Sequence, residues 1–280
     1  MTSFHGMLRA IVLAFALVVT TACADGGHAG QDGKGRKAGG QGLNDPAKKD
    51  IAMQLVSSAE NSSLDWKAQY KYIEDIGDGR GYTAGIIGFC SGTGDMLAVV
   101  EAYTKERPGN GLAPFLPALR AVNGSDSHEG LGRPFTDAWA RAAASDAAFR
   151  AAQDAVRDRA YFTPAVRQAQ RDGLGALGQF IYYDAYVMHG SADGKQTVGF
   201  RSMRNTALRN AEPPAQGGDE AAYLNAFLDA RVDAIRREPS HSDTSRIETA
   251  QRVFVREGNF GLEPPLRWKV YGDSYRIDAE

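Results

Sequence analysis

A series of segments with helical periodicity covers most of the chain after residue 94, and it constrains the fold more than any other feature. Apolar residues recur there at steps of three and four, which is typical of helices with one buried face. Short glycine- and proline-rich breaks separate the segments. The stretch from Phe135 to Gly190 is long enough to connect two lobes with a cleft between them. We expect helices over 95–106, 112–122, 135–158, 164–172, 177–188, 199–211, 220–236 and 245–256.

The segment before residue 94 predicts one helix followed by β-structure. Residues 44–46 (Asn-Asp-Pro) supply an N-cap and a proline at the first helical position, and the apolar spacing that follows ends near Ser62 or Ser63. Two β-prone runs, 70–76 and 82–89, flank the sequence Gly-Asp-Gly-Arg-Gly, which favours a hairpin or tight loop. With 280 residues and 43% hydrophobic content, the chain can bury a large core. The sequence predicts a mainly α (α+β) fold with a small β-sheet or hairpin.

The first 24 residues have the features of a secretory signal peptide. Arg9 precedes an apolar run, 11–19, that is too short to span a bilayer, and Ala22-Cys23-Ala24 provides a small-residue cleavage site. We expect cleavage after Ala24 and an extracellular protein. A lipoprotein modified at Cys23 is the alternative, although Thr20-Thr21-Ala22-Cys23 lacks the leucine expected for it.

The mature chain is expected to begin with a flexible tether. Residues 25–42 contain no hydrophobic side chain larger than alanine, so burial cannot offset the entropy lost on ordering them. The folded domain then spans 43–280. Its only cysteine is Cys90, which cannot form an internal disulfide and lies in an apolar sequence, so we expect a small buried side chain rather than a reactive thiol.

Charge and histidine content exclude some functions. A formal net charge of -2 argues against general nucleic-acid binding, which needs a clustered basic surface. The histidines are scattered, and none lies in a metal-binding pattern, so we expect neither a metal nor a cofactor. They are His5, His28, His128, His189 and His241. We interpret His189 as a structural residue at a helix end.

Two carboxylates occupy contrasting positions. Glu60 lies in the last turn of the first predicted helix and shares a face with Val56, and both circumstances disfavour its negative charge. Asp78 lies between two glycines close to Arg80, which favours its ionised form. One protonated and one ionised carboxyl group is the division that glycoside hydrolysis requires. The same positions also fit a solvated glutamate at a helix end and a turn aspartate that caps its own loop.

The residues around both carboxylates resemble those of the family 46 chitosanases among the glycoside hydrolases. The resemblance covers nearly everything from Leu43 onward. Its motifs are residues 57–66 (SSAENSSLDW), 72–83 (YIEDIGDGRGYT), 88–95 (GFCSGTGD), 176–180 (ALGQF), 182–184 (YYD), 187–190 (VMHG), 264–266 (PPL), 268–269 (WK) and 271–273 (YGD).

The resemblance implies an endo-acting hydrolase of β-1,4-linked glucosamine polymers. It implies two largely helical lobes, a lysozyme-like core and a substrate cleft between the lobes. It places the general acid on Glu60 and the general base on Asp78, with Thr83 helping to hold the attacking water. In inverting enzymes the two carboxyl groups stand roughly 6.5 to 9.5 Å apart. We expect a separation at or beyond the upper part of this range, with closure on substrate.

Chitosan is a polycation below neutral pH, so acidic side chains are expected along its binding site. The candidates are Glu74, Asp75 and Asp95, with Ser62, Tyr72 and Arg80 as polar partners. Without the resemblance, Glu74 and Asp75 would be interpreted as a solvated edge. The resemblance also implies a buried ionic network of Asp184, Arg231 and Arg246 that orients the catalytic region. It assigns Trp66, Trp139 and Trp268 to packing and makes Tyr161 a candidate for the cleft or the lobe interface.

Two alternatives stay open: a non-catalytic protein that binds chitosan or cell wall, and a lysozyme-like muramidase. We expect a monomer that binds neither nucleic acid nor, after signal cleavage, a membrane. Tolerance for N-acetylated sugars, product lengths and the pH optimum do not follow from the sequence.

Overall fold

The computed structural model describes residues 42–191, 198–237 and 243–279, all within one compact unit that spans residues 38–280. The predicted signal peptide (1–24) lies outside the described residues, as does the predicted tether except for Gly42. The described part contains α1 (Pro46–Glu60), η1 (Trp66–Lys71), β1 (Ile73–Asp75), β2 (Tyr82–Ala84), β3 (Phe89–Cys90), α2 (Asp95–Glu106), η2 (Ala113–Phe115), α3 (Leu116–Val122), α4 (Gly132–Ser145), α5 (Ala147–Arg157), η3 (Asp158–Phe162), α6 (Thr163–Arg171), α7 (Ala176–His189), α8 (Phe200–Asn210), η4 (Pro214–Gln216), α9 (Glu220–Arg236), η5 (Ile247–Gln251), α10 (Arg252–Arg256), β4 (Leu266–Val270) and β5 (Asp273–Ile277).

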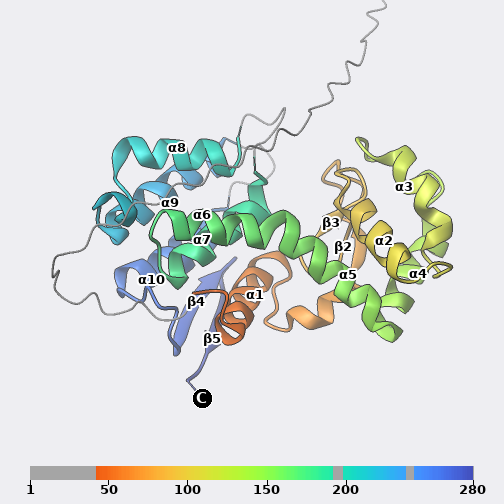
Figure 1. The fold of residues 1–280 in the computed structure, drawn as a ribbon, viewed down its shortest axis with the longest axis horizontal. Helices are drawn as coiled ribbons and strands as arrows, with labels where there is room; N and C mark the ends of the chain where they lie inside the picture. Colours follow the sequence, from red (N-terminus) through yellow and green to blue (C-terminus); the bar gives the residue numbers. More distant parts are fainter. Residues whose placement is uncertain (1–41, 192–197, 238–242, 280) are drawn as a thin grey trace, which may run out of the picture. The chain divides into compact units, whose positions relative to one another are not determined.

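The predicted fold class is confirmed, because the described residues are mostly helical with a small antiparallel sheet (Figure 1). Helices α2 and α9 have the predicted bounds. Helix α1 begins as predicted, since the Asp45 carboxylate accepts hydrogen bonds from the backbone N–H groups of Ala47 and Lys48. It ends at Glu60, two or three residues before the expected end.

The single helix predicted over 135–158 is wrong. Asp146 separates α4 from α5 because its backbone is extended and its carboxylate accepts a hydrogen bond from the N–H of Ala148 at 2.8 Å. A capping aspartate favours a new helix start over a continuous helix. Beyond α5, the π-helical turn η3 leads directly into α6, and together they form the long green run in Figure 1.

The three-stranded sheet has the order β1-β2-β3, with both pairs antiparallel. In its register Glu74 pairs with Thr83, and Thr83 pairs with Cys90. The run predicted over 82–89 contains a second turn, where Gly85 and Gly88 both adopt φ of 73°. A positive φ favours glycine, and these two positions divide the predicted strand into β2 and β3.

We did not predict the C-terminal hairpin of β4 and β5 from the sequence. Leu266, Trp268 and Val270 are buried while the residues between them are exposed, which is the alternation of a half-buried strand. The turn has positive φ at Tyr271 (52°) and Gly272 (89°). The alternation is visible in the sequence, but the predicted helical pattern ended at residue 256 and nothing was assigned beyond it.

Two hydrophobic clusters form the core. The first contains buried residues of α1, α6–α10 and β4, including Tyr183, Phe227 and Trp268. The second lies around β2, β3 and α2–α5, including Trp139 and Phe149. Trp66, Tyr161 and Val187 pack against both clusters, so these side chains lie where the clusters meet. Trp139 and Trp268 are buried as expected, whereas Trp66 is half-buried.

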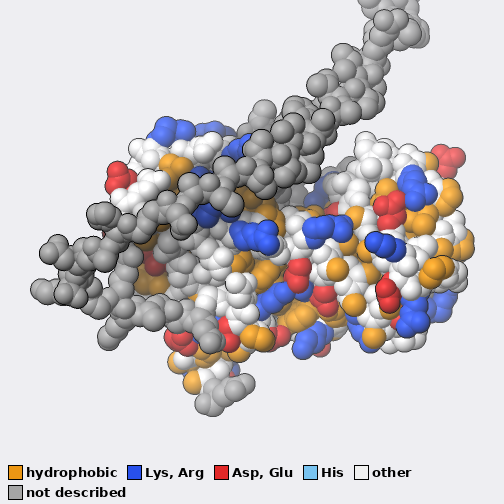
Figure 2. Space-filling model, viewed as in Figure 1, with side chains coloured by type: hydrophobic (Ala, Val, Ile, Leu, Met, Phe, Trp, Pro, Cys, Tyr) orange, Lys and Arg blue, Asp and Glu red, His pale blue; other side chains and the backbone are white. Residues whose placement is uncertain are grey.

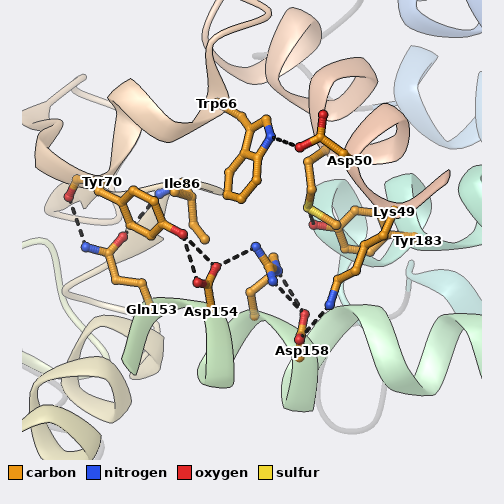
Figure 3. A network of polar contacts seen from close by, with 11 residues as sticks. Lys49, Asp50, Trp66, Tyr70, Ile86, Gln153, Asp154, Asp158 and Tyr183 are labelled. Atoms are coloured by element: carbon orange, nitrogen blue, oxygen red, sulfur yellow. Dashed lines mark hydrogen bonds and ion pairs between the residues drawn. The ribbon is translucent and has the colours of Figure 1, made fainter. Parts of the chain in front are cut away.

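Polar contacts also join the two clusters (Figure 3). The buried guanidinium of Arg157 donates to Asp154 at 2.8 Å and to Asp158 at 2.9 Å. Asp154 accepts the hydroxyl of Tyr70, and Asp158 pairs with Lys49 of α1 at 2.8 Å. The end of α5 is therefore tied to α1 and to η1. On the face shown in Figure 2, basic and acidic side chains are interspersed.

Candidate active site

Glu60 is the last residue of α1, and its carboxylate contacts an arginine from a distant part of the chain. Arg246 Nη2 donates to Glu60 Oε1 at 2.8 Å. The Glu60 side chain is 27% exposed, whereas that of Arg246 is buried. Neither the apolar spacing of α1 nor its end indicates this contact, because tertiary packing brings the two side chains together.

Arg246 also connects Glu60 to a buried ionic network. Its Nη2 donates to Asp184 Oδ1 at 2.7 Å, and Arg231 Nη2 lies 2.9 Å from Asp184 Oδ2. The structure therefore brings together the three residues that the resemblance implied. Burial raises the pKa of Asp184, but the two guanidinium groups outweigh burial and lower it to about 2.

Gln251 completes this network and was missed. Its Nε2 donates to Asp184 Oδ2 at 2.7 Å, and its Oε1 accepts from Arg231 Nη1 at 2.8 Å. Gln251 lies five residues after Arg246, a spacing that a regular α-helix does not place on one face. The π-helical turn η5 widens the helix there and brings both side chains to Asp184.

Asp78 lies in the turn between β1 and β2 and is held locally. Its Oδ1 accepts from the backbone N–H of Arg80 at 3.0 Å, and its Oδ2 accepts from Arg80 Nε at 2.8 Å and Nη2 at 2.5 Å. Gly77 and Gly79 on either side adopt φ of 72° and 80°. Asp78 therefore caps its own loop and also pairs with Arg80, while its role as general base remains a prediction.

Arg80 links the two carboxylates electrostatically. Burial lowers its pKa, but the hydrogen bond with Asp78 and the negative charges around it, including those of Asp78 and Glu60, outweigh burial and raise it. Its guanidinium therefore stays charged beside Asp78. The predicted separation of the carboxyl groups remains a prediction.

Thr83 lies in β2 beside the Asp78 turn and is 7% exposed. Its hydroxyl is 3.5 Å from the sulfur of Cys90, its cross-strand partner. Cys90 is buried as predicted, and burial raises the pKa of its thiol. The sulfur therefore packs against Thr83 as a neutral group.

The exposed acids of β1 lie next to the Asp78 turn. Glu74 Oε2 accepts the hydroxyl of Tyr72 at 3.4 Å. Asp75 Oδ1 accepts from the N–H of Gly77 at 2.8 Å, and its Oδ2 is 3.5 Å from His128 Nε2. Both acids are exposed to solvent, as is Ser62 just after α1. Both acids therefore lie in the strand that leads into the Asp78 turn.

Asp95 is engaged differently from Glu74 and Asp75. Its Oδ1 accepts hydrogen bonds from Cys90 N, Thr93 Oγ1 and Met96 N at 2.6 to 2.9 Å. Its Oδ2 accepts the hydroxyl of Tyr161 at 2.9 Å. These bonds join β3, the start of α2 and η3. A contact between Asp95 and substrate remains a prediction, and it would have to share an oxygen with one of these donors.

His189 is the last residue of α7 and is buried. Burial, aided by the charges of Arg231 and Arg246, lowers its pKa to about 3. In the described residues no group of three or more His, Cys, Asp or Glu side chains could hold a metal ion. His5, His28 and His241 lie outside them. No helix in the described part of the chain is both long and apolar enough to cross a bilayer.

Known proteins resemble this chain over most of its length. Residues 54–266 match the model of glycosyl hydrolase family 46. The chitosanase of Streptomyces sp. (strain N174) is 60% identical over 280 residues, which cover 98% of this chain and 100% of that protein. The chitosanase of Bacillus subtilis (strain 168) is 38% identical over 243 residues, 83% of this chain and 86% of that protein.

A solved structure of chitosanase OU01, described as a co-crystal with substrate, has the same fold. Its TM-score is 0.82 at 61% identity, and the match covers 85% of this chain and 99% of that one. A family match across residues 54–266, together with relatives aligned over most of their length, leaves one assignment. The chain belongs to glycosyl hydrolase family 46.

Proposed function

We propose that this protein is an endo-acting chitosanase that hydrolyses β-1,4 linkages between glucosamine residues with inversion. The observation that carries the proposal is 60% identity to a chitosanase over 98% of the chain. The surroundings of Arg80 add support, since its guanidinium bonds to Asp78 and the charge of Glu60 also raises its pKa.

Glu60 donates a proton to the oxygen of the leaving sugar, and Asp78 accepts a proton from the attacking water. Thr83 helps to hold that water. Before the reaction Glu60 must carry a proton, which weakens its attraction to Arg246. Arg246 keeps Asp184 as an acceptor of the same Nη2 group, so the guanidinium stays in place when Glu60 becomes neutral.

Glucosamine units carry ammonium groups, which favour exposed acids. Glu74 and Asp75 fill this role beside Asp78, with Ser62, Tyr72 and Arg80 as polar partners for sugar hydroxyls or for the acids. The signal-peptide features of residues 1–24 support secretion. We infer an extracellular monomer that reaches its polymer directly.

Isosteric replacement of each carboxyl group tests the proposal. Glu60→Gln and Asp78→Asn should each lower chitosan cleavage, followed by viscosity and reducing ends, by about 10²–10⁴-fold. Matched controls are Glu101→Gln, which removes an exposed carboxylate paired with Arg120, and Asp137→Asn. The controls should stay within about twofold, as exposed pairs contribute little. A folded Glu60→Gln or Asp78→Asn variant with full activity would contradict the assignment.

The wild-type protein decides between the alternatives. Faster turnover of chitosan than of peptidoglycan by one preparation is expected of a chitosanase, and the reverse order would indicate a muramidase. Protein that binds glucosamine oligomers without shortening them would indicate a non-catalytic binding protein.

A further inference from the structure

The side chain of Thr83 makes a polar contact with strand β3, which has no part so far in the proposed reaction. Thr83 and Cys90 are cross-strand partners, and the Thr83 hydroxyl oxygen lies 3.5 Å from the Cys90 sulfur. Within the ranges 42–191, 198–237 and 243–279, this sulfur is the one hydrogen-bond partner of the hydroxyl. The thiol also donates to the backbone carbonyl of Gly88 at 3.2 Å. A chain of two hydrogen bonds therefore joins Thr83 to a backbone oxygen.

The number of protons in this chain fixes the direction of both bonds. A carbonyl oxygen can only accept, so the single proton of the thiol points to Gly88. The sulfur then has no proton to give to Thr83 and accepts the proton of the Thr83 hydroxyl. That hydroxyl has one proton and two lone pairs, and its proton is used in this bond. The Thr83 oxygen is therefore set to accept a hydrogen bond from a third group.

This order of bonds requires a protonated thiol beside the proposed base. Burial raises the pKa of Cys90, as do the charges of Asp95 and Asp78, and together they outweigh the bond from Thr83 and the charge of Arg80. The thiol therefore keeps its proton. The charges of Asp78 and Arg80 both act on the thiol, so the chain lies within electrostatic range of that pair.

Packing fixes the positions of both side chains. Thr83 is buried, and a Cβ atom on Gly88 would lie 3.2 Å from the Thr83 methyl carbon, so glycine leaves room for that methyl group. Because a β-branched side chain has few χ1 rotamers, a methyl group packed there also fixes the hydroxyl. The backbone N–H of Cys90 donates to Asp95 Oδ1 at 2.8 Å, which holds β3. The contact between hydroxyl and sulfur therefore belongs to a rigid part of the sheet.

We propose that Cys90 is a positioning residue that orients the Thr83 hydroxyl as a hydrogen-bond acceptor for the attacking water. The inference rests on the proposed function, in which Thr83 holds that water and Asp78 accepts its proton. A water that donates one proton to Asp78 and the other to Thr83 keeps a lone pair for the sugar carbon. As Asp78 takes the proton, the water oxygen bonds to that carbon, and the leaving sugar oxygen takes the proton of Glu60. A Thr83 hydroxyl that donated to the water would occupy the lone pair needed for attack.

Steady-state kinetics of the full chain on a glucosamine hexamer tests this proposal with two substitutions of Cys90. Cys90→Ala removes the acceptor and frees the Thr83 proton, so kcat should fall by about three- to tenfold with KM unchanged, as for the loss of one hydrogen bond. Cys90→Ser again donates to Gly88 and accepts from Thr83, so its kcat should stay within about twofold of the wild type. A sulfur that only fills space predicts the reverse order, because a hydroxyl is less favourable than a methyl group in an apolar site.

A double-mutant cycle then shows whether Cys90 acts through Thr83. Thr83→Val should lower kcat by about tenfold or more, because the water loses a partner. In that background Cys90→Ala should change kcat by less than about twofold, since the hydroxyl that it orients is absent. The matched control is Val100→Ala, which truncates a buried side chain of α2 in the second hydrophobic cluster. The control should lose stability and keep kcat within about twofold at temperatures well below unfolding.

Several results would overturn the proposal. They are an unchanged kcat in Cys90→Ala, a kcat for Cys90→Ser as low as that for Cys90→Ala, an equal fall in Val100→Ala, and effects of Cys90→Ala and Thr83→Val that multiply in the double variant. If Thr83→Val kept full kcat, the role of Thr83 in holding the water would fail together with this inference. The roles of Glu60 and Asp78 would stand, because their own variants test them.

Discussion

Glu60 and Asp78 are held in place in different ways. Glu60 ends a 15-residue helix and contacts Arg246, which lies 186 positions away in the chain. Arg246 in turn belongs to a buried network with Asp184 and Arg231. Asp78 lies in a turn and is held by Arg80, two residues away. The position of the proposed acid therefore depends on the packing of a hydrophobic cluster, whereas the proposed base bonds to Arg80 within its own turn.

Because of this difference, we expect substitutions near Glu60 to lower both stability and activity, and substitutions near Asp78 to lower mainly activity. Changes in the Arg246 network should affect the folded state as well as activity, because they leave charges buried without a partner. Changes at Arg80 should affect activity with little effect on folding, because its side chain is about half exposed.

The largest expected effect on stability comes from the buried ionic network that contacts Glu60. Asp184→Asn removes the negative charge between Arg231 and Arg246, so the buried guanidinium of Arg231 loses its carboxylate partner and Arg246 keeps only Glu60. We expect the free energy of unfolding to fall by about 3–5 kcal/mol. Urea unfolding of this variant beside Arg80→Ala, which should cost no more than about 1 kcal/mol, measures the contrast. If both variants lost the same free energy of unfolding, Glu60 and Asp78 would not differ in how they are held in place.

His189 gives the same region a dependence on pH. Its folded pKa is about 3, and a histidine in the unfolded chain titrates near 6.5. The unfolded state therefore binds more protons between these values, so stability must fall as pH falls from 6.5 towards 3. Between pH 6.5 and 4 we expect a loss of up to about 3 kcal/mol from this group.

Unfolding experiments on His189→Gln at several pH values test this assignment. The variant should lose most of the slope in that pH window. Asp184 contributes only at lower pH, because its stabilisation is present above about pH 4 and is lost as pH falls towards its folded pKa of about 2. If the variant still lost stability between pH 6.5 and 4 as the wild type does, groups other than His189 would cause this pH dependence.

Substitution of Arg80, which bonds to Asp78, should lower the catalytic rate. Arg80→Lys keeps a positive charge but cannot reproduce the two donors, Nε and Nη2, that reach Asp78 Oδ2. We expect kcat to fall by on the order of tenfold to hundredfold, with a smaller change in KM and no measurable loss of stability. Steady-state kinetics with glucosamine oligomers separates the two constants. An increase in KM alone would place Arg80 in substrate binding only.

The smallest effect concerns the other end of α1. Asp45→Ala removes the cap at Ala47 and Lys48 and should cost about 1 kcal/mol of stability. Activity at temperatures well below unfolding should not change, because Glu60 is held at the C-terminal end of the helix by Arg246. Thermal unfolding and a rate assay on the same sample check both statements. A loss of activity larger than the loss of folded protein would show that the cap positions Glu60.

Local signals in the sequence predicted much of the fold. The bounds of α2 and α9 and the cap of α1 follow from apolar spacing and from residues next to each other in the chain. The break at Asp146 was missed because a capping aspartate also occurs inside exposed helix faces. The β4–β5 hairpin was missed although β4 alternates between buried and exposed residues.

The site was harder to predict in its contacts than in its residues. The family resemblance indicated Glu60, Asp78 and three members of the Arg246 network. No local pattern indicates that Arg246 contacts Glu60, since tertiary packing brings the two together. Gln251 depends on a π-helical turn, and Asp95 is engaged by four donors from three segments. Such contacts depend on the whole fold.

The division of labour between Glu60 and Asp78 is tested most directly by proton NMR of the first product formed from a glucosamine oligomer. If Asp78 activates water on the face opposite the leaving sugar, the new reducing end appears first as the α-anomer and then equilibrates. A first-formed β-anomer would mean retention, with a carboxylate acting as nucleophile, and would contradict the roles assigned to the pair.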